Sequence, residues 1–149
     1  MKLSDPLLFD TNILVYAHNQ DSPFHKQCLA LITAATEGYF KGILAQQNLL
    51  EFYSIITDKR RVTKPLTPIK ATELLEDYFV GPFRIIIPNH MTVKIFSLLT
   101  RKNKIKNGQA FDAYLVATML SHRIKNIVTV NTKDFKLYNE IKTLDISEF

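Results

Sequence analysis

The chain has 149 residues, enough for one domain with one hydrophobic core, and its 46% hydrophobic and 22% charged residues exclude an intrinsically disordered protein. Nineteen lysines and arginines against fourteen acids give a formal net charge of +5, which favours a polyanionic partner. No stretch approaches the roughly 20 apolar residues of a membrane span, and the single cysteine excludes an internal disulfide, so we expect a cytoplasmic protein with one domain over residues 1–149 and no membrane partner.

The first predicted elements alternate between a strand and helices. The run LLFD, residues 7–10, is typical of a buried strand that ends in a polar residue, and a short helix is expected over 13–17. Ser22 and Pro23 predict the start of a second helix, with Gly38 as its stop. The N-terminal quarter therefore predicts a strand followed by two helices.

A strand and two longer helices are predicted next. The sequence YFKGILA predicts a strand over 39–45, and the apolar spacing that follows predicts a helix over 46–60 with basic residues in its last turn. Thr67 and Pro68 open another helix, which Gly81 ends. This segment repeats the strand and helix alternation.

The C-terminal half continues this alternation. A strand is predicted over 83–88, then a helix that Asn89 caps, then a polar loop over 101–109. Residues 111–123 are apolar almost all round, as in a buried helix, and 127–130 predict a short buried strand.

The order of the elements predicts the fold class. A last, edge strand is expected near residues 142–146. Strands separated by helices of ten or more residues imply a mostly parallel sheet that is flanked by helices on both faces. The sequence therefore predicts an α/β fold.

Polar residues lie where several predicted elements begin or end. Asp10 ends the first strand, and Asn131 and Asp134 follow the strand over 127–130. Asp112 lies in the first turn of a helix, and Glu51 lies inside the helix after the second strand. Ligands of open parallel sheets bind just beyond the carboxyl ends of the strands, so these side chains are the candidate site.

Each acid also has a purely structural interpretation. Asp10 and Asp112 could cap helices, Asn131 and Asp134 could shape a turn, and Glu51 could lie on an exposed helix face. Taken together, however, clustered carboxylates repel one another unless a cation neutralises them, and Mg²⁺ and Mn²⁺ prefer oxygen ligands. The group therefore predicts a divalent-metal site of the kind that hydrolyses phosphodiesters.

Basic residues recur in short clusters that could hold the phosphates of a nucleic acid. Any one of these clusters could equally be a solvated loop or helix end, and it is their number that favours nucleic acid. The clusters are Lys59, Arg60, Arg61 and Lys64; Arg101, Lys102, Lys104 and Lys106; Arg123 and Lys125; and Lys133 and Lys136.

Four segments together resemble a known family. They read FDTNILVYAH, NLLEFYSIIT, FDAYLVATML and VTVNTKDF, in this order, and they cover nearly the whole chain. The pattern resembles PIN domains, and most closely the VapC toxins of type II toxin-antitoxin systems.

This resemblance implies a Rossmann-like sheet and an endoribonuclease that depends on Mg²⁺ or Mn²⁺. It also implies a homodimer that a small antitoxin inhibits. Asp10 matches the first metal-binding acid, Glu51 the acid on a helix, and Asp112 the acid that opens the later helix. Asn131 falls where many members have a fourth acid. We expect Asp10 and Asp112 to be the main metal ligands, with Glu51 and Asn131 completing the catalytic set.

The resemblance also assigns the neighbours of these residues. Thr11 and Asn12 belong to the first motif, and Asp134 belongs to the NTKDF motif, so these three are candidate substrate-binding residues. Because the amide of Asn131 lacks the charge of an acid, it binds a second metal poorly. We therefore expect one firmly held ion rather than a permanent two-metal site.

Two other functions compete with this prediction. Phosphotransferases of the haloacid dehalogenase type also begin with an acid after an apolar strand, but they need a second Asp where this chain has Asn12. A PIN-fold module that binds nucleic acid or a partner, with its catalysis weakened by Asn131, is the stronger alternative. Against it stand the three intact acids Asp10, Glu51 and Asp112.

Overall fold

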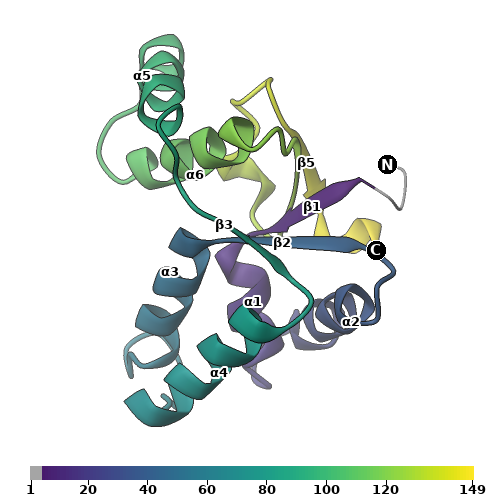
Figure 1. The fold of residues 1–149 in the computed structure, drawn as a ribbon. Coiled ribbons are helices and arrows are strands. Elements are labelled where there is room, and N and C mark those ends of the chain that lie inside the picture. The colour runs from purple at the N-terminus through teal and green to yellow at the C-terminus, as the bar shows by residue number, and fades with distance from the viewer. Residues whose placement is uncertain (1–4) are drawn as a thin grey trace.

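The computed structural model describes residues 5–149 and contains one five-stranded sheet, in which every neighbouring pair is parallel (Figure 1). The strand order is β3-β2-β1-β4-β5, so β1 lies at the centre of the sheet. The strands are β1 (Pro6–Phe9), β2 (Lys41–Ala45), β3 (Arg84–Ile86), β4 (Asn126–Thr129) and β5 (Lys142–Asp145). The predicted α/β fold with a parallel sheet is confirmed.

Helices connect the strands and cover both faces of the sheet (Figure 1). The helices are α1 (Thr11–Ala17), α2 (His25–Thr36), α3 (Gln46–Ile56), α4 (Pro68–Val80), α5 (Thr92–Asn103) and α6 (Gln109–Ser121), with short 3-10 turns η1 (Thr132–Asp134) and η2 (Ile146–Glu148). None of the helices in residues 5–149 is both long enough and apolar enough to cross a membrane.

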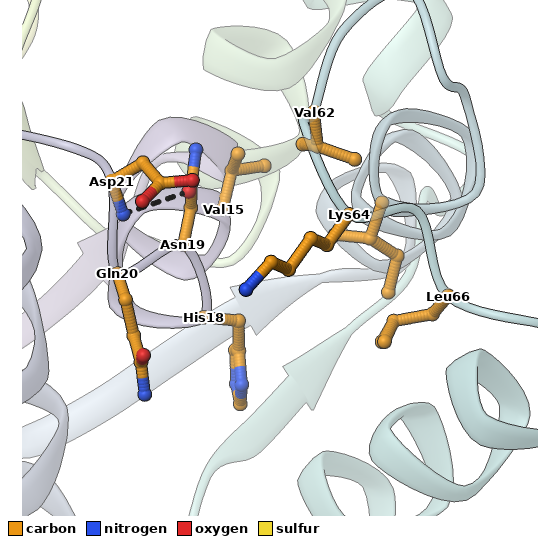
Figure 2. Close-up of a pocket in the computed structure, with 9 residues that line it drawn as sticks. Val15, His18, Asn19, Gln20, Asp21, Val62, Lys64 and Leu66 are labelled. Atoms are coloured by element: carbon orange, nitrogen blue, oxygen red, sulfur yellow. Dashed lines mark hydrogen bonds between the residues drawn. The ribbon is translucent and has the colours of Figure 1, made fainter.

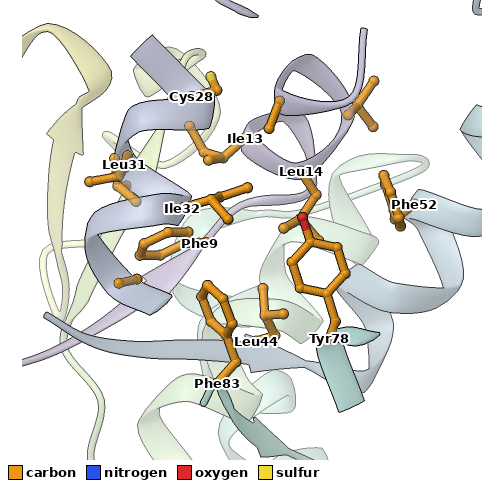
Figure 3. Close-up of a cluster of buried hydrophobic side chains, with 14 of the residues drawn as sticks. Phe9, Ile13, Leu14, Cys28, Leu31, Ile32, Leu44, Phe52, Tyr78 and Phe83 are labelled. Atoms are coloured by element: carbon orange, nitrogen blue, oxygen red, sulfur yellow. The ribbon is translucent and has the colours of Figure 1, made fainter. Parts of the chain in front are cut away.

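The sheet separates two hydrophobic clusters. Because successive strand residues point to opposite faces, Leu7 and Phe9 join one cluster and Leu8 joins the other. The first cluster contains buried residues of α1 to α4 and is shown in Figure 3; the second contains those of α5 and α6. Helices α3 and α6 therefore pack into different cores.

Helix α3 is shorter than predicted. It ends at Ile56, whereas the sequence predicted a helix up to residue 60. The carboxylate of Asp58 accepts a hydrogen bond from the backbone N–H of Arg60 at 2.8 Å and forms a salt bridge with the same residue, and such a local contact competes with helical hydrogen bonding. The basic residues Lys59, Arg60, Arg61 and Lys64 therefore lie in a loop and not in the last turn of a helix.

Other helix boundaries also differ from the prediction. The hydroxyl of Ser22 accepts a hydrogen bond from the backbone N–H of Phe24, but this forms a turn and α2 begins only at His25. Helix α5 continues to Asn103, so the predicted loop over 101–109 is shorter. These differences leave the order of the elements unchanged.

Gly42 on β2 fits closely against an aromatic side chain. A Cβ atom at this position would lie 2.6 Å from the ring of Phe83, and that ring is held by edge contacts with Phe9 and Tyr78. We expect Gly42→Ala to lower the free energy of unfolding by about 1–3 kcal/mol, as overpacked cores do. Urea unfolding measures this change. Gly108→Ala is the control, because a Cβ there meets no atom within 4 Å, and equal losses in both variants would contradict the packing argument.

Candidate functional site

Asp10 is fixed in place at the end of the central strand. It directly follows β1 and is the N-cap of α1, where its Oδ1 accepts a hydrogen bond from the backbone N–H of Thr11 at 2.8 Å. Its Oδ2 accepts hydrogen bonds from the Thr129 hydroxyl at 2.7 Å and from Asn12 Nδ2 at 2.9 Å. Three donors therefore fix the orientation of this carboxylate.

Asn12 and Thr129 connect the carboxyl ends of β1 and β4. Asn12 Nδ2 also donates to the Thr129 hydroxyl at 2.9 Å, and Asn12 Oδ1 accepts from the backbone N–H of Val130 at 3.2 Å. The Thr129 hydroxyl further accepts from the backbone N–H of Asn131 at 3.0 Å. Asn12, a predicted substrate-binding residue, thus holds the Asp10 carboxylate and the end of β4.

Glu51 on α3 is connected to the same loop through Thr11. The Thr11 hydroxyl donates to Glu51 Oε2 at 3.0 Å and accepts from Asn48 Nδ2 at 3.1 Å. The side chain of Gln47, one turn before Glu51, donates from Nε2 to Glu51 Oε1 at 2.7 Å and to the backbone carbonyl of Phe111 at 3.0 Å. Phe111 is followed directly by Asp112, so these contacts connect the segments that carry all three acids.

Burial and mutual repulsion raise the pKa of two of these acids. Burial is the largest cause of the rise in the pKa of Asp10 to about 7; hydrogen bonds from Thr129 and Thr11 oppose it, and the charges of Asp112 and Glu51 add to it. Burial also raises the pKa of Asp112 to about 6, and the charges of Asp134 and Glu51 add to the rise.

The predicted residues therefore share one electrostatic environment. Glu51 raises the pKa of both Asp10 and Asp112, which come from different elements at the carboxyl end of the sheet. The sequence analysis grouped these side chains because ligands bind beyond the carboxyl ends of parallel strands, and the structure brings them close enough to influence one another.

No basic side chain neutralises this group in the described part of the chain. The two salt bridges between residues 5 and 149 join Asp58 to Arg60 and Glu140 to Lys102, and both lie outside the group. No three Asp, Glu, His or Cys side chains within the same range lie close enough together to form a ready metal-binding set. The acids are thus coupled by charge without forming a closed ligand cage.

Asn131 and Asp134 lie on the exposed rim of this group. Asn131 Nδ2 donates a hydrogen bond to the Asp134 carboxylate, which belongs to the 3-10 turn η1. Asp134 lies near enough to Asp112 to raise its pKa, whereas the side chain of Asn131 adds no charge. The rim therefore keeps one acid next to Asp112.

Three residues of this network were missed at the sequence level: Gln47, Asn48 and Thr129. Gln47 lies four residues before Glu51, a spacing at which side chains meet on a helix, so this contact had a detectable signal. Thr129 is a polar residue inside the apolar strand run IVTV, so it could also have been recognised from the sequence. The contact of Gln47 with Phe111 joins residues 64 positions apart and had no signal in the sequence.

A separate pocket lies at the other end of α1. It is formed between the C-terminal part of that helix and the loop after α3, and its lining includes His18, Asp21 and Lys64 (Figure 2). Asp10, Glu51 and Asp112 do not line it. The pocket is therefore distinct from the acidic group.

Known proteins resemble this chain over most of its length. Residues 7–141 match the family model of the PIN domain. Ribonuclease VapC24 of Mycobacterium tuberculosis is 27% identical over 129 residues, which are 87% of this chain and 88% of that protein. Ribonuclease VapC48 of the same organism is 26% identical over 92% of this chain and 94% of its own length.

Solved structures share the fold at lower identity. A toxin-antitoxin complex from Klebsiella pneumoniae contains a chain with a TM-score of 0.62 and 21% identity, matched over 92% of this chain and 96% of that one. VapBC2 from Rickettsia felis, bound to a DNA fragment from its promoter, gives a TM-score of 0.66 at 17% identity over 94% and 98%. The resemblance drawn from the sequence motifs is thus confirmed, and the chain belongs to the PIN domain family.

Proposed function

We propose that this protein is a ribonuclease toxin of the VapC type, acting in the cytoplasm, that hydrolyses RNA phosphodiester bonds with the help of Mg²⁺ or Mn²⁺. The observation that carries the proposal is the charge-coupled group of Asp10, Glu51 and Asp112, which comes from three separate elements and has no basic partner among residues 5–149. Two relatives that match nearly the whole chain are ribonucleases.

The acids fit a divalent cation because burial, with mutual repulsion adding to it, raises the pKa of Asp10 and Asp112, and a bound cation would favour their charged forms. Asp10 and Asp112 would hold the ion, directly or through water, since the side chains do not form a closed ligand set within residues 5–149. When bound, the ion lowers the pKa of a water molecule and stabilises charge on the attacked phosphate. Glu51 is assigned either to the ion's shell or to accepting the proton of that water.

The neighbouring residues have supporting roles in this proposal. Thr11 and Asn12 hold the carboxylates of Glu51 and Asp10 through the hydrogen bonds described above. Asn131 would orient water or a phosphate oxygen through its amide, and Asp134 would position Asn131 beside the substrate.

Basic residues near α3 offer a surface for the rest of the RNA. Lys59, Arg61 and Lys64 are exposed in the loop after α3, where their charges can attract phosphates. Arg60 is already paired with Asp58 and is less available. We propose that this loop, which also lines the pocket at the other end of α1, binds RNA outside the acidic group.

A small antitoxin protein is the proposed protein partner. Several structural neighbours are toxin-antitoxin complexes, including one from Klebsiella pneumoniae and VapBC-1 from nontypeable Haemophilus influenzae. We also propose that the free protein forms a homodimer, a state that light scattering on the purified protein measures directly.

The proposal is tested by incubating the purified protein with total RNA. We expect cleavage with Mg²⁺ or Mn²⁺ and none with excess EDTA, and mapping of the cut ends would define the substrate. Cleavage that continues unchanged in EDTA would contradict a metal-dependent nuclease.

The alternative function is a PIN-fold module that binds RNA or a partner protein without cutting RNA. Asn131 at the place of a fourth acid and the open arrangement of the acids favour it. Binding of RNA without a divalent metal, together with no cleavage of any RNA offered, would support this alternative over the nuclease.

Replacement of Asn131 tests the number of ions. We expect Asn131→Asp to add a carboxylate beside Asp134 and Asp112, and therefore to raise the number of bound Mn²⁺ ions from one toward two. Isothermal titration calorimetry measures this stoichiometry. Asn19→Asp, which lies at the separate pocket of α1, is the matched control. Two ions already bound by the unchanged protein would contradict the single-ion expectation.

A further inference from the structure

The side chain of Gln47 connects the helices that carry two of the acids. Its Nε2 donates to Glu51 Oε1 at 2.7 Å and to the backbone carbonyl of Phe111 at 3.0 Å. Glu51 lies one turn further along α3, and Phe111 directly precedes Asp112 in the first turn of α6. The side-chain amide of Gln47 therefore connects α3 near Glu51 to the first turn of α6.

The buried residues of α3 and α6 belong to different hydrophobic clusters. The buried residues Leu49 and Phe52 of α3 belong to the core on one face of the sheet, and Ala113 and Val116 of α6 belong to the core on the other face. Figure 1 shows α3 and α6 on opposite sides of the sheet. The Gln47 side chain therefore supplies a direct polar contact between two helices that share no hydrophobic cluster.

The chemistry of its partners fixes the orientation of the Gln47 amide. The Glu51 carboxylate and the Phe111 carbonyl can only accept hydrogen bonds, so the NH₂ group must face both of them. Rotation of the amide by half a turn would place Oε1 against two oxygens. Both amide hydrogens are used, while Oε1 is buried without a hydrogen-bond partner among the described residues. The bridge thus leaves one buried acceptor without a partner among the described residues.

We propose that Gln47 is a positioning residue that holds Glu51 and the start of α6 at the spacing that a divalent cation requires. This inference rests on the proposed metal-dependent function. Glu51 and Asp112 carry like charges, and the neutral Gln47 amide bridges Glu51 and the residue before Asp112, so it opposes their separation. Residues that orient metal ligands in this way commonly change metal affinity by about 10-fold to 100-fold when they are replaced.

The test compares Gln47→Leu with Gln46→Leu. Gln46 is the adjacent residue, is exposed, and makes no side-chain hydrogen bond to the described residues, so its replacement is a matched control. We expect Gln47→Leu to weaken Mn²⁺ binding by about 10-fold or more in calorimetry, and Gln46→Leu to leave it unchanged.

A second measurement needs neither metal nor RNA. In metal-free protein, amide hydrogen exchange at residues 110–114 should be faster in Gln47→Leu than in Gln46→Leu, because the start of α6 loses its connection to α3. Unchanged exchange, or faster exchange with unchanged Mn²⁺ affinity, would overturn the positioning role. If the unchanged protein binds no Mn²⁺ while exchange still rises in Gln47→Leu, the connection between the helices stands and the proposed function fails.

Discussion

Replacing Asp10 with asparagine is expected to reduce metal-dependent RNA cleavage by at least about 10³-fold. The carboxylate would hold the cation that stabilises the attacked phosphate, and loss of such stabilisation amounts to several kcal/mol, at about 1.4 kcal/mol for each factor of ten in rate. Asparagine is also a good N-cap, because its amide oxygen can still accept from the backbone N–H of Thr11, so the fold should remain although one acceptor for Thr129 and Asn12 is lost. Cleavage of a labelled RNA under single-turnover conditions measures the effect.

A second variant, in α6, tests whether the effect belongs to the whole site and not only to the segment after β1. Asp112→Asn should cause a loss of similar size, although Asp112 lies on α6, whose buried residues belong to the other hydrophobic cluster. Glu73→Gln, on the exposed side of α4, removes an acid far from this network and should leave cleavage unchanged. Retained metal-dependent cleavage in both Asp10→Asn and Asp112→Asn would refute the assignment of the site.

The stability of the metal-free protein should fall as the pH rises. The pKa of Asp10 is about 7 in the folded protein against an ordinary 3.8, so the folded state holds this proton more tightly than the unfolded state does. The folded state is therefore favoured at low pH, and this advantage is lost progressively from about pH 4 to about pH 7. About three pKa units at about 1.4 kcal/mol each set an upper bound near 4 kcal/mol, and we expect roughly half of it because Asp10 is partly exposed to solvent.

Urea unfolding in EDTA at pH 5 and pH 8 measures this effect. The part of the pH dependence that comes from Asp10 should disappear in Asp10→Asn, while the smaller part from Asp112, whose pKa is about 6, should persist. Adding Mn²⁺ at pH 8 should restore stability, by about 2.7 kcal/mol at a concentration one hundred times the dissociation constant. An Asp10→Asn protein with the same pH dependence as the unchanged one would contradict the assigned pKa.

The central features of the fold were predictable because they depend on local patterns. The run before Asp10 is apolar and short, and the structure has β1 over Pro6–Phe9 with Asp10 directly after it. The same alternation of strands and long helices gave the parallel sheet, and the rule that ligands lie beyond the carboxyl ends of strands gathered Asp10 and Asp112 at one end.

The errors arose where side chains or packing override a pattern. The apolar spacing predicted a helix up to residue 60. The Asp58 contact with Arg60 forms a turn there instead, so α3 ends at Ile56. In α4, the buried Tyr78 is followed directly by Phe79, which is 67% exposed. Spacing along the chain does not reveal which side of an outer helix meets its neighbours.

The parts of the site that were missed depend on contacts between distant segments. Gln47 meets the Phe111 carbonyl and Thr129 meets Asp10, and both pairs are far apart in the sequence. A single sequence carries no signal for such pairs when one partner is a backbone group. The acids could be predicted because their charge is unusual at the ends of apolar elements, whereas neutral hydrogen-bonding residues are common everywhere.

The central claim is that Asp10, Glu51 and Asp112 together hold one divalent cation. A crystal structure of the protein grown with Mn²⁺ tests it most directly, because the anomalous signal of manganese locates the ion independently of the protein atoms. We predict one strong peak within coordination distance of the Asp10 and Asp112 carboxylates or of water molecules bound to them. Manganese absent from this place at saturating concentration, with the three carboxylates turned away from one another, would contradict the account.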